Sequence, residues 1–259
     1  MKSLVRLAAA AGLLALLPQF PAAALSQPLP PLVHSHQVVV VVTDNWDANQ
    51  GKLQAYTRDS KGWRPHGPAF DVAIGRAGSA WGVGLLGRPA DGPQKREGDG
   101  RSPAGVFAIG SAFGYADKAA TGLAYQPMQR THYCMDVPAS PHYNQIVDAR
   151  KVGANAVKGS TEPMRLDLHN KGDVRYRQGF VIANNETNTP GDGSCIFAHL
   201  WRQPGEATAG CTAMSAAHMR SLLAWLSDEA RPRFVLMPRA QYQFYQGPWE
   251  LPALTEALR

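Results

Sequence analysis

The sequence predicts a mainly β fold, a sandwich or a barrel-like sheet, formed by a single domain. Short apolar runs rich in β-branched and aromatic residues alternate with clusters of Gly, Pro, Asn and Asp, which is typical of strands joined by turns. Only one segment has the spacing of an amphipathic helix. About 235 residues follow an N-terminal export segment, enough for one sizeable core.

The chain begins like a signal peptide. Positive charges near the start precede the apolar run Leu7 to Leu17 and the small residues Ala22 to Ala24. We therefore expect residues 1–24 to be a signal peptide and the mature protein to lie in the periplasm. The apolar run is shorter than the roughly 20 residues of a membrane span, and no later run approaches that length. No transmembrane segment is expected after signal cleavage.

Composition divides the rest of the chain. Residues 25–36 form a Pro-rich leader that cannot be helix or central strand. Residues 37–238 are expected to be the folded domain, and residues 239–259 a C-terminal tail packed on that domain. The strand candidates, in chain order, are Val38–Thr43, Leu53–Arg58, Ala69–Ile74, Gly105–Ile109, Tyr133–Val137, Phe180–Ala183, Cys195–Trp201 and Phe234–Met237.

The predicted helix begins near Ser215, a residue type favoured at helix N-caps. Arg231 followed by Pro232 is expected to end it. Its apolar residues recur at the i, i+3, i+4, i+7 spacing of one buried face: Met219, Leu222, Leu223 and Leu226.

The charge of the chain is mildly basic. The formal net charge is +6, and removal of Lys2 and Arg6 with the signal peptide leaves 6 − 2 = +4. No dense run of Lys and Arg occurs, so a nucleic-acid partner is not expected. A weak positive field suits an anionic polymer, but it is equally compatible with an ordinary basic exported protein.

The chemistry is predicted in a stretch that reads as strand, loop, cysteine and helix, from Cys195 to the helix at Ser215. A free thiol has a pKa of about 8.5, so a cysteine nucleophile needs a partner that favours or accepts its proton. His199 can serve Cys211 in this way. Gly210 allows a tight turn that presents backbone N–H groups, and Gly210 and Cys211 are the expected oxyanion donors.

Strand geometry separates the two nearby cysteines. If Cys195 and His199 lie four residues apart on one strand, about 13 Å separates them, far beyond hydrogen-bond reach. Cys211 follows a loop that can fold back to the end of the strand. Cys211 is therefore the partner that the chain permits for His199.

With these residues, the stretch from about Val38 to Pro238 resembles the L,D-transpeptidase catalytic domain of enzymes that cross-link peptidoglycan. The most specific pattern is His199 followed by a loop and Thr208-Ala209-Gly210-Cys211, and the second is the run Gly98 to Phe107. The helix after the cysteine is the third. The resemblance implies a mixed β-sandwich with one helix after the catalytic cysteine, with Cys211 as nucleophile and His199 as general base and acid.

The sequence also departs from the family pattern. Many members carry a histidine before the Gly-Cys pair and an arginine two residues after the cysteine, where this chain has Ala209 and Ala213, and Leu200 replaces a frequent glycine. A different cation would then hold a substrate carboxylate, with Arg202, Arg165 and Arg130 as candidates. The group that orients His199 is left open between a backbone carbonyl, Asp192 and Ser194. Expected residues of the substrate cleft are Trp201, Thr208 and Thr212.

The resemblance implies a concrete reaction in cell-wall biogenesis and the control of cell shape. The Cys211 thiolate attacks the third residue of a tetrapeptide stem of peptidoglycan, expels D-Ala and forms a thioester. An amine of another stem, or of an envelope protein, then takes the acyl group, whereas transfer to water would make the enzyme an L,D-carboxypeptidase. The alternatives are a non-catalytic peptidoglycan-binding or structural envelope protein that retains the fold, and a cysteine peptidase or amidase acting on other peptides.

The remaining cysteines allow two interpretations. An exported protein with three cysteines tends to pair two, which predicts a disulfide between Cys134 and Cys195 and leaves Cys211 free; two unpaired core thiols are the alternative. A zinc site would use the same cysteines with His132 and His199, but no Cys-x-x-Cys pair occurs. We expect neither a metal nor an organic cofactor.

Overall fold

The computed structural model describes residues 30–259. The predicted signal peptide, residues 1–24, and the first part of the predicted leader lie outside the described residues. Within the described part, none of the helices combines the length and hydrophobicity that crossing a bilayer requires.

One large mixed sheet forms most of the molecule. It contains ten strands, which are β1 Gln37–Thr43, β2 Gln50–Asp59, β3 Gly62–Ala73, β4 Ser79–Trp81, β5 Ser102–Gly114, β6 Tyr125–Pro127, β10 Gln178–Ile182, β11 Phe197–Leu200, β12 Thr212–Met214 and β13 Arg233–Pro238.

The order of the strands closes the large sheet. The path runs β10-β11-β12-β3-β2-β1-β13-β5-β4, and β10 also pairs with β5, so the sheet curls back on itself. The pairs β1–β13, β11–β12, β4–β5 and β5–β6 are parallel, and the others are antiparallel. The prediction of a mainly β, mixed sandwich-like or barrel-like fold is confirmed.

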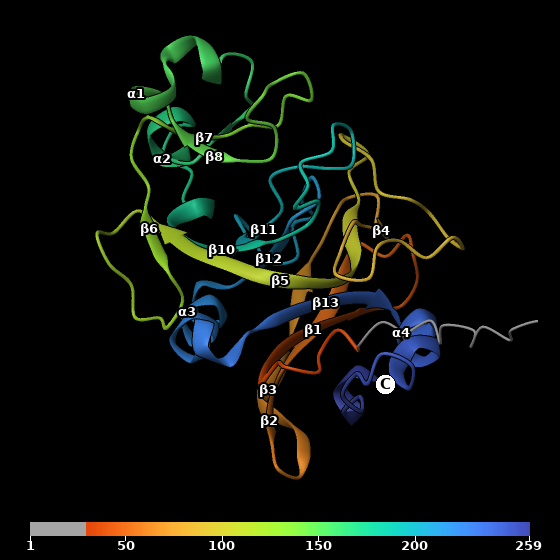
Figure 1. The fold of residues 1–259 in the computed structure, drawn as a ribbon. Coiled ribbons are helices and arrows are strands. Elements are labelled where there is room, and N and C mark those ends of the chain that lie inside the picture. The colour runs from red at the N-terminus through yellow and green to blue at the C-terminus, as the bar shows by residue number, and fades with distance from the viewer. Residues whose placement is uncertain (1–29) are drawn as a thin grey trace, which may run out of the picture.

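A small second sheet lies apart from the large one. Figure 1 shows it with two short helices as a lobe beside β6 and β10. Its strand order is β8-β7-β9. The strands and helices of this lobe are β7 His132–Cys134, β8 Ile146–Asp148, β9 Glu162–Pro163, α1 Ala149–Val152, α2 Leu166–His169 and the 3-10 turn η1 Ala154–Val157.

The remaining helices cover the large sheet. Figure 1 shows α3 and α4 on opposite sides of the strands β13 and β1. The helices are α3 Ala216–Trp225 and α4 Arg239–Gln246, and the 3-10 turns are η2 Arg175–Arg177, η3 Asp228–Ala230 and η4 Glu256–Leu258.

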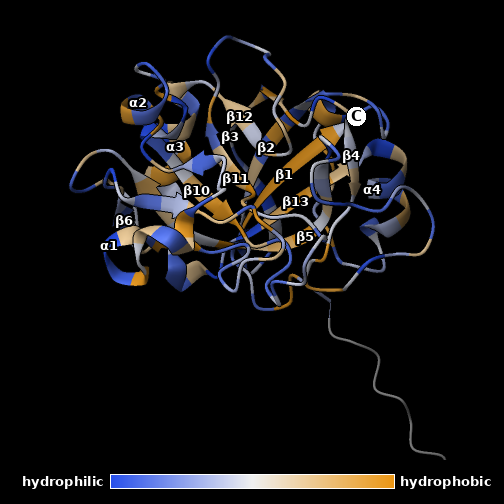
Figure 2. Ribbon diagram, turned by 90° about the horizontal axis from the view of Figure 1, so that it is seen from above, coloured by the Kyte–Doolittle hydropathy of each residue, from blue (hydrophilic) through white to orange (hydrophobic). Residues whose placement is uncertain are grey.

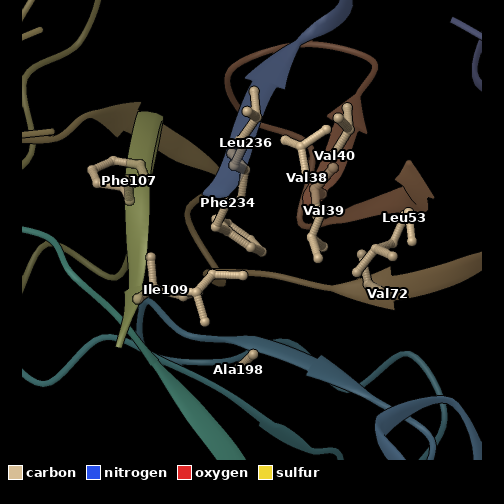
Figure 3. Close-up of a cluster of buried hydrophobic side chains, with 14 of the residues drawn as sticks. Val38, Val39, Val40, Leu53, Val72, Phe107, Ile109, Ala198, Phe234 and Leu236 are labelled. Atoms are coloured by element: carbon tan, nitrogen blue, oxygen red, sulfur yellow. The ribbon is translucent and has the colours of Figure 1, made fainter. Parts of the chain in front are cut away.

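Strand β1 lies at the centre of the core. Its valines, Val38 to Val42, are all buried because β2 and β13 flank the strand and α4 packs against it. A continuous apolar run is typical of a strand covered on both faces. Figure 2 shows the hydrophobic residues concentrated on β1 and β13. Figure 3 shows side chains of this core, which come from β1, β13 and the neighbouring strands and include Val39, Leu53, Val72, Phe107, Phe234 and Leu236.

Helix α3 begins as predicted and ends earlier. The Ser215 side chain accepts a hydrogen bond from the His218 N–H, which caps the first turn. The helix ends at Trp225, not at Arg231, because Leu226 and the next residues leave it to pair with Gly122: the Gly122 N–H donates to the Leu226 carbonyl at 2.9 Å. The four apolar residues of its predicted buried face, Met219, Leu222, Leu223 and Leu226, are all buried.

Two local predictions were wrong. Cys195 does not lie in a strand, since β11 begins at Phe197 and Cys195 has a left-handed φ of 56°. The segment after the nucleophile also contains a second helix, α4, where only one was expected. Of this helix only Tyr242 is fully buried.

Residues 239–259 contribute to the main core. Tyr242, Leu251, Leu254 and Leu258 are buried and belong to the same hydrophobic cluster as the valines of β1. The Tyr242 hydroxyl donates to the Pro252 carbonyl at 2.9 Å.

Candidate active site

The turn that carries Cys211 packs against the start of β5. A Cβ atom added at Gly210 would lie 3.1 Å from the Arg101 carbonyl oxygen, so a larger residue would push these segments apart. The Ser102 hydroxyl faces the carbonyls of Gly210 at 2.7 Å and Cys211 at 3.0 Å, and it accepts a hydrogen bond from the Gly75 N–H. Ser102 is fully buried. The run Gly98 to Phe107 therefore supports the nucleophile from behind.

Thr208 closes the same turn from the other side. Its hydroxyl donates to the Cys211 carbonyl at 2.7 Å and accepts from the Gly210 N–H at 3.1 Å. The Gly210 N–H is thus used within the turn. To act as an oxyanion donor, as the sequence predicts, Gly210 must exchange this bond for a substrate oxygen.

The Cys211 sulfur lies at the inner end of the turn. Its Sγ accepts a hydrogen bond from the Phe197 N–H at 3.3 Å and contacts the Cys195 carbonyl oxygen at 3.5 Å. Only 8% of the residue is exposed. Burial raises the pKa of the Cys211 thiol to about 12, and the negative charge of Glu162 adds to this rise. The resting residue is therefore a thiol.

His199 lies within β11 and is buried. Its Nδ1 is 2.8 Å from the Leu200 carbonyl oxygen, which can only accept, so Nδ1 carries the proton and Nε2 keeps its lone pair. Burial lowers the pKa of His199 to about 4, which keeps the ring neutral at physiological pH. The group that orients the ring is thus a backbone carbonyl. Of the two other candidates, Asp192 pairs with Arg88, and the Ser194 hydroxyl donates to Glu97.

The two candidate catalytic residues lie on and directly before two neighbouring parallel strands. His199 is opposite Ala213 in the register of β11 and β12, and Cys211 directly precedes β12. Within residues 30–259 no hydrogen bond joins the thiol to the imidazole. Such bonds often form only once substrate is bound, so this arrangement leaves His199 available as a general base for Cys211.

Cys211 borders a charged pocket of about 170 Å³. Lys95 is buried in its wall and donates to Asp99 and to the Arg96 carbonyl. Arg76 also borders the pocket, and within the described part of the chain its side chain forms no ion pair. The carboxylates that line the pocket are Glu97, Asp136 and Glu162.

Comparison with known proteins gives one result. The sequence model of the YkuD family, the L,D-transpeptidase catalytic domain, matches residues 37–235. The chain belongs to this family. No curated protein and no solved structure matches the chain. At the level of the family, the YkuD domain is an acyltransferase of the L,D-transpeptidase type that acts on peptidoglycan.

Within this YkuD domain, the expected cleft residues lie elsewhere. None of Trp201, Thr208 and Thr212 borders the Cys211 pocket. Thr212 is only 1% exposed because it pairs with Ala198 inside the sheet, and Thr208 is occupied in the nucleophile turn.

The expected carboxylate anchors also differ. Arg202 pairs with Glu206, Arg165 pairs with Asp167, and neither borders the pocket that contains Cys211. Ala213, in the position of the family arginine, is 1% exposed in β12. Sequence reasoning missed Arg76, which reaches the pocket from the loop after β3. No local signal could have identified it, because Arg76 and Cys211 are far apart in the chain.

The structure joins Cys134 and Cys195 in a disulfide and leaves Cys211 as the free cysteine of the described residues. The disulfide, and not strand geometry, is the reason why Cys195 is no partner for His199. Across residues 30–259, no group of three or more His, Cys, Asp or Glu side chains is arranged to hold a metal ion.

Proposed function

We propose that this YkuD domain is an exported L,D-transpeptidase in which Cys211 is the nucleophile and His199 the general base and acid. The observation that carries the proposal is a free cysteine at the edge of a charged pocket, directly before the strand that pairs with the strand of a neutral histidine whose Nε2 lone pair is available. Export rests on the signal-peptide pattern of residues 1–24.

The neutral states of both residues favour general-base catalysis. As the Cys211 sulfur attacks the carbonyl of the third stem residue, its proton passes to His199 Nε2. The peptide bond breaks, D-Ala leaves with that proton on its nitrogen, and the acyl group remains on sulfur as a thioester. The Arg76 guanidinium supplies the cation for a stem carboxylate in this pocket.

In the second half of the reaction the thioester is transferred. An acceptor nitrogen bonds to the acyl carbon, the carbon–sulfur bond breaks, and the sulfur recovers a proton through His199. A second stem as acceptor gives a 3-3 cross-link, an envelope protein gives an anchored protein, and water gives the tripeptide.

The test uses intact-protein mass spectrometry of the mature protein with a disaccharide-tetrapeptide, alongside Cys211→Ala. We expect D-Ala release, an acyl adduct that requires Cys211, and new dimers. Loss of the nucleophile should lower D-Ala release by about 10⁴-fold or more. Tripeptide without dimer would identify water as the acceptor, and folded protein without adduct or release would refute the proposal.

A second function has a specific observation in its favour. Burial raises the pKa of the Cys211 thiol to about 12, which a non-catalytic peptidoglycan-binding protein that retains the fold could tolerate without cost. The same experiment separates the two functions, because a binding protein retains the muropeptide without forming an adduct. Arg76→Ala would weaken retention in both cases, so only the adduct decides between them.

A further inference from the structure

Glu162 is the carboxylate of the Cys211 pocket that also contacts the histidine side of the site. Its Oε2 accepts a hydrogen bond from the Tyr176 hydroxyl at 2.6 Å. Tyr176 is buried, and its ring packs edge-on against His199, with ring centroids 5.3 Å apart. The Tyr176 side chain therefore connects Glu162, which borders the open pocket, to the buried His199.

The disulfide holds Glu162 in this place. In the small sheet, Glu162 of β9 is paired directly with Cys134 of β7, and Cys134 is bonded to Cys195. The Cys195 carbonyl oxygen in turn contacts the Cys211 sulfur. One short path, made of a strand pairing, the disulfide and this contact, thus links the backbone of Glu162 to Cys211.

The other carboxylates of the pocket accept more hydrogen bonds than Glu162. Glu97 accepts from the Ser194 and Tyr143 hydroxyls, both at Oε2, and of its two oxygens only Oε1 has no donor among the described residues. Asp136 accepts from the N–H and the hydroxyl of Thr161 with both of its oxygens. In the part of the chain that the structure describes, no donor contacts Oε1 of Glu162, which leaves one carboxylate oxygen for a ligand.

The charge of Glu162 does not help the first half of the reaction. Burial raises the pKa of Glu162 to about 6, so the group is mostly ionised at neutral pH. Its negative charge raises the pKa of the Cys211 thiol and so opposes thiolate formation. A negative charge in this position is useful only once a cation enters the pocket.

We propose that Glu162 binds the ammonium group of the acyl acceptor and so directs the thioester to an amine instead of water. This inference rests on the proposed function. The ammonium gives one proton to the Glu162 carboxylate, and the freed lone pair forms the nitrogen–carbon bond to the thioester carbonyl. The carbon–sulfur bond breaks, and the second proton of the nitrogen returns through His199 to the Cys211 sulfur, which restores the thiol.

The experiment compares Glu162→Gln with wild type on the disaccharide-tetrapeptide and measures dimer and tripeptide separately. Glutamine keeps one oxygen for the Tyr176 hydroxyl and replaces the other by an uncharged NH2 group, which cannot accept a proton from an ammonium group. A charged hydrogen bond contributes about 1.5–3 kcal/mol, so the dimer-to-tripeptide ratio should fall about 10- to 100-fold while D-Ala release persists. Asp117→Asn, which makes the same charge change at an exposed carboxylate outside the pocket, should leave the ratio near wild type.

Two further readouts separate a charge effect from a structural effect. Alkylation of Cys211 by iodoacetamide should be faster in Glu162→Gln than in wild type, because the opposing charge is gone, whereas a collapsed pocket would slow it. Transfer to hydroxylamine, which is uncharged at mildly alkaline pH, should be unchanged. Glu162→Asp, which keeps the charge, should retain most of the dimer formation.

The outcomes are distinct. An unchanged dimer-to-tripeptide ratio in Glu162→Gln, or an equal fall in Asp117→Asn, overturns the role of Glu162 and leaves the proposed function intact. If wild type forms neither an acyl-enzyme nor D-Ala, the proposed function fails and this inference fails with it.

Discussion

Cys211 and His199 are both kept neutral by burial, with the pKa of the thiol raised to about 12 and that of the imidazole lowered to about 4. A thiolate–imidazolium pair is therefore not the resting state. In the proposed reaction the thiol loses its proton while it attacks, and the Nε2 lone pair of His199 is the group proposed to accept it. When a substrate fills the pocket beside Cys211, it replaces the solvent next to the thiol, so the environment of the thiol during the attack differs from that of the resting protein.

The rate at which iodoacetamide modifies Cys211 should report this neutral state. Because the pKa of the thiol lies near 12, the thiolate fraction rises about tenfold per pH unit, so the rate should keep rising between pH 6 and 9. Mass spectrometry of the alkylated protein measures it, with Cys211→Ala as the unlabelled control. A plateau below pH 7 would instead indicate a preformed ion pair.

Ser102 should prove important although it touches no substrate. Ser102→Ala leaves the Gly75 N–H without its buried acceptor and the Gly210 carbonyl without its donor. We expect the free energy of unfolding to fall by about 1–3 kcal/mol. Urea unfolding of the variant measures this, and Thr187→Ala, at an exposed threonine, should change it by less than about 0.5 kcal/mol. Equal stability of the two variants would contradict this role for Ser102.

The small sheet places the carboxylate of Glu162 at the pocket that contains Cys211, whereas His199 lies in the large sheet. Strands β7, β8 and β9 are short, and the disulfide from Cys134 to Cys195 joins them to the segment just before β11. The lobe can therefore hold Glu162 in position only if that bond, or packing equivalent to it, is present.

Removal of the disulfide should destabilise the protein and change its product. The bond closes a loop of sequence separation 61, and loss of such a bond costs about 2–4 kcal/mol of unfolding free energy. Denaturant unfolding of the double variant Cys134→Ala/Cys195→Ala tests this, and its dimer-to-tripeptide ratio should fall as in Glu162→Gln. Reductant should lower the stability of wild type and leave that of the double variant unchanged; equal stability of the oxidised wild type and the double variant would contradict the prediction.

In the domain as a whole, the closed large sheet buries both His199 and Cys211. Strand β10 pairs with both β11 and β5, which closes the sheet beside His199, and α3 covers the neighbouring face. Such burial has a consequence for stability as a function of pH, because a neutral buried imidazole resists protonation in the folded state and not in the unfolded state.

Acid should weaken the fold through His199. The pKa is about 4 in the folded protein and 6.5 for an ordinary histidine, so the unfolded chain binds more protons between these values. The stabilising contribution is complete above pH 6.5 and is lost as the pH falls through 4, by at most about 3 kcal/mol. Glu162 acts in the opposite sense, because its raised pKa gives a contribution that is lost as the pH rises through about 6.

The difference between wild type and His199→Gln isolates the histidine. The advantage of wild type in unfolding free energy should shrink as the pH is lowered from 6.5 to 4, as measured by denaturant titration at each pH. A constant difference across this range would show that His199 is not held neutral by the fold.

Local pattern was sufficient for much of the fold. The valine run of β1 predicts a strand, and the spacing from Met219 to Leu226 predicts α3, because both signals repeat within a few residues. Helix α4 escaped prediction because its place in the fold depends on Tyr242 reaching the core of distant strands. Cys195 was assigned to a strand because its left-handed φ has no signal in the neighbouring residues.

The candidate nucleophile and base could be named from the sequence alone, since His199, Gly210 and Cys211 lie within one short stretch whose residue types carry the chemistry. Their surroundings were decided by tertiary structure. Ser102 and Glu162 contact the site from segments far away in the chain, and the carbonyl of Leu200 could not be selected over a carboxylate without the register of β11. Side-chain chemistry is a local property of the sequence, whereas proximity, burial and the pKa values that follow from them arise only when distant strands pack together.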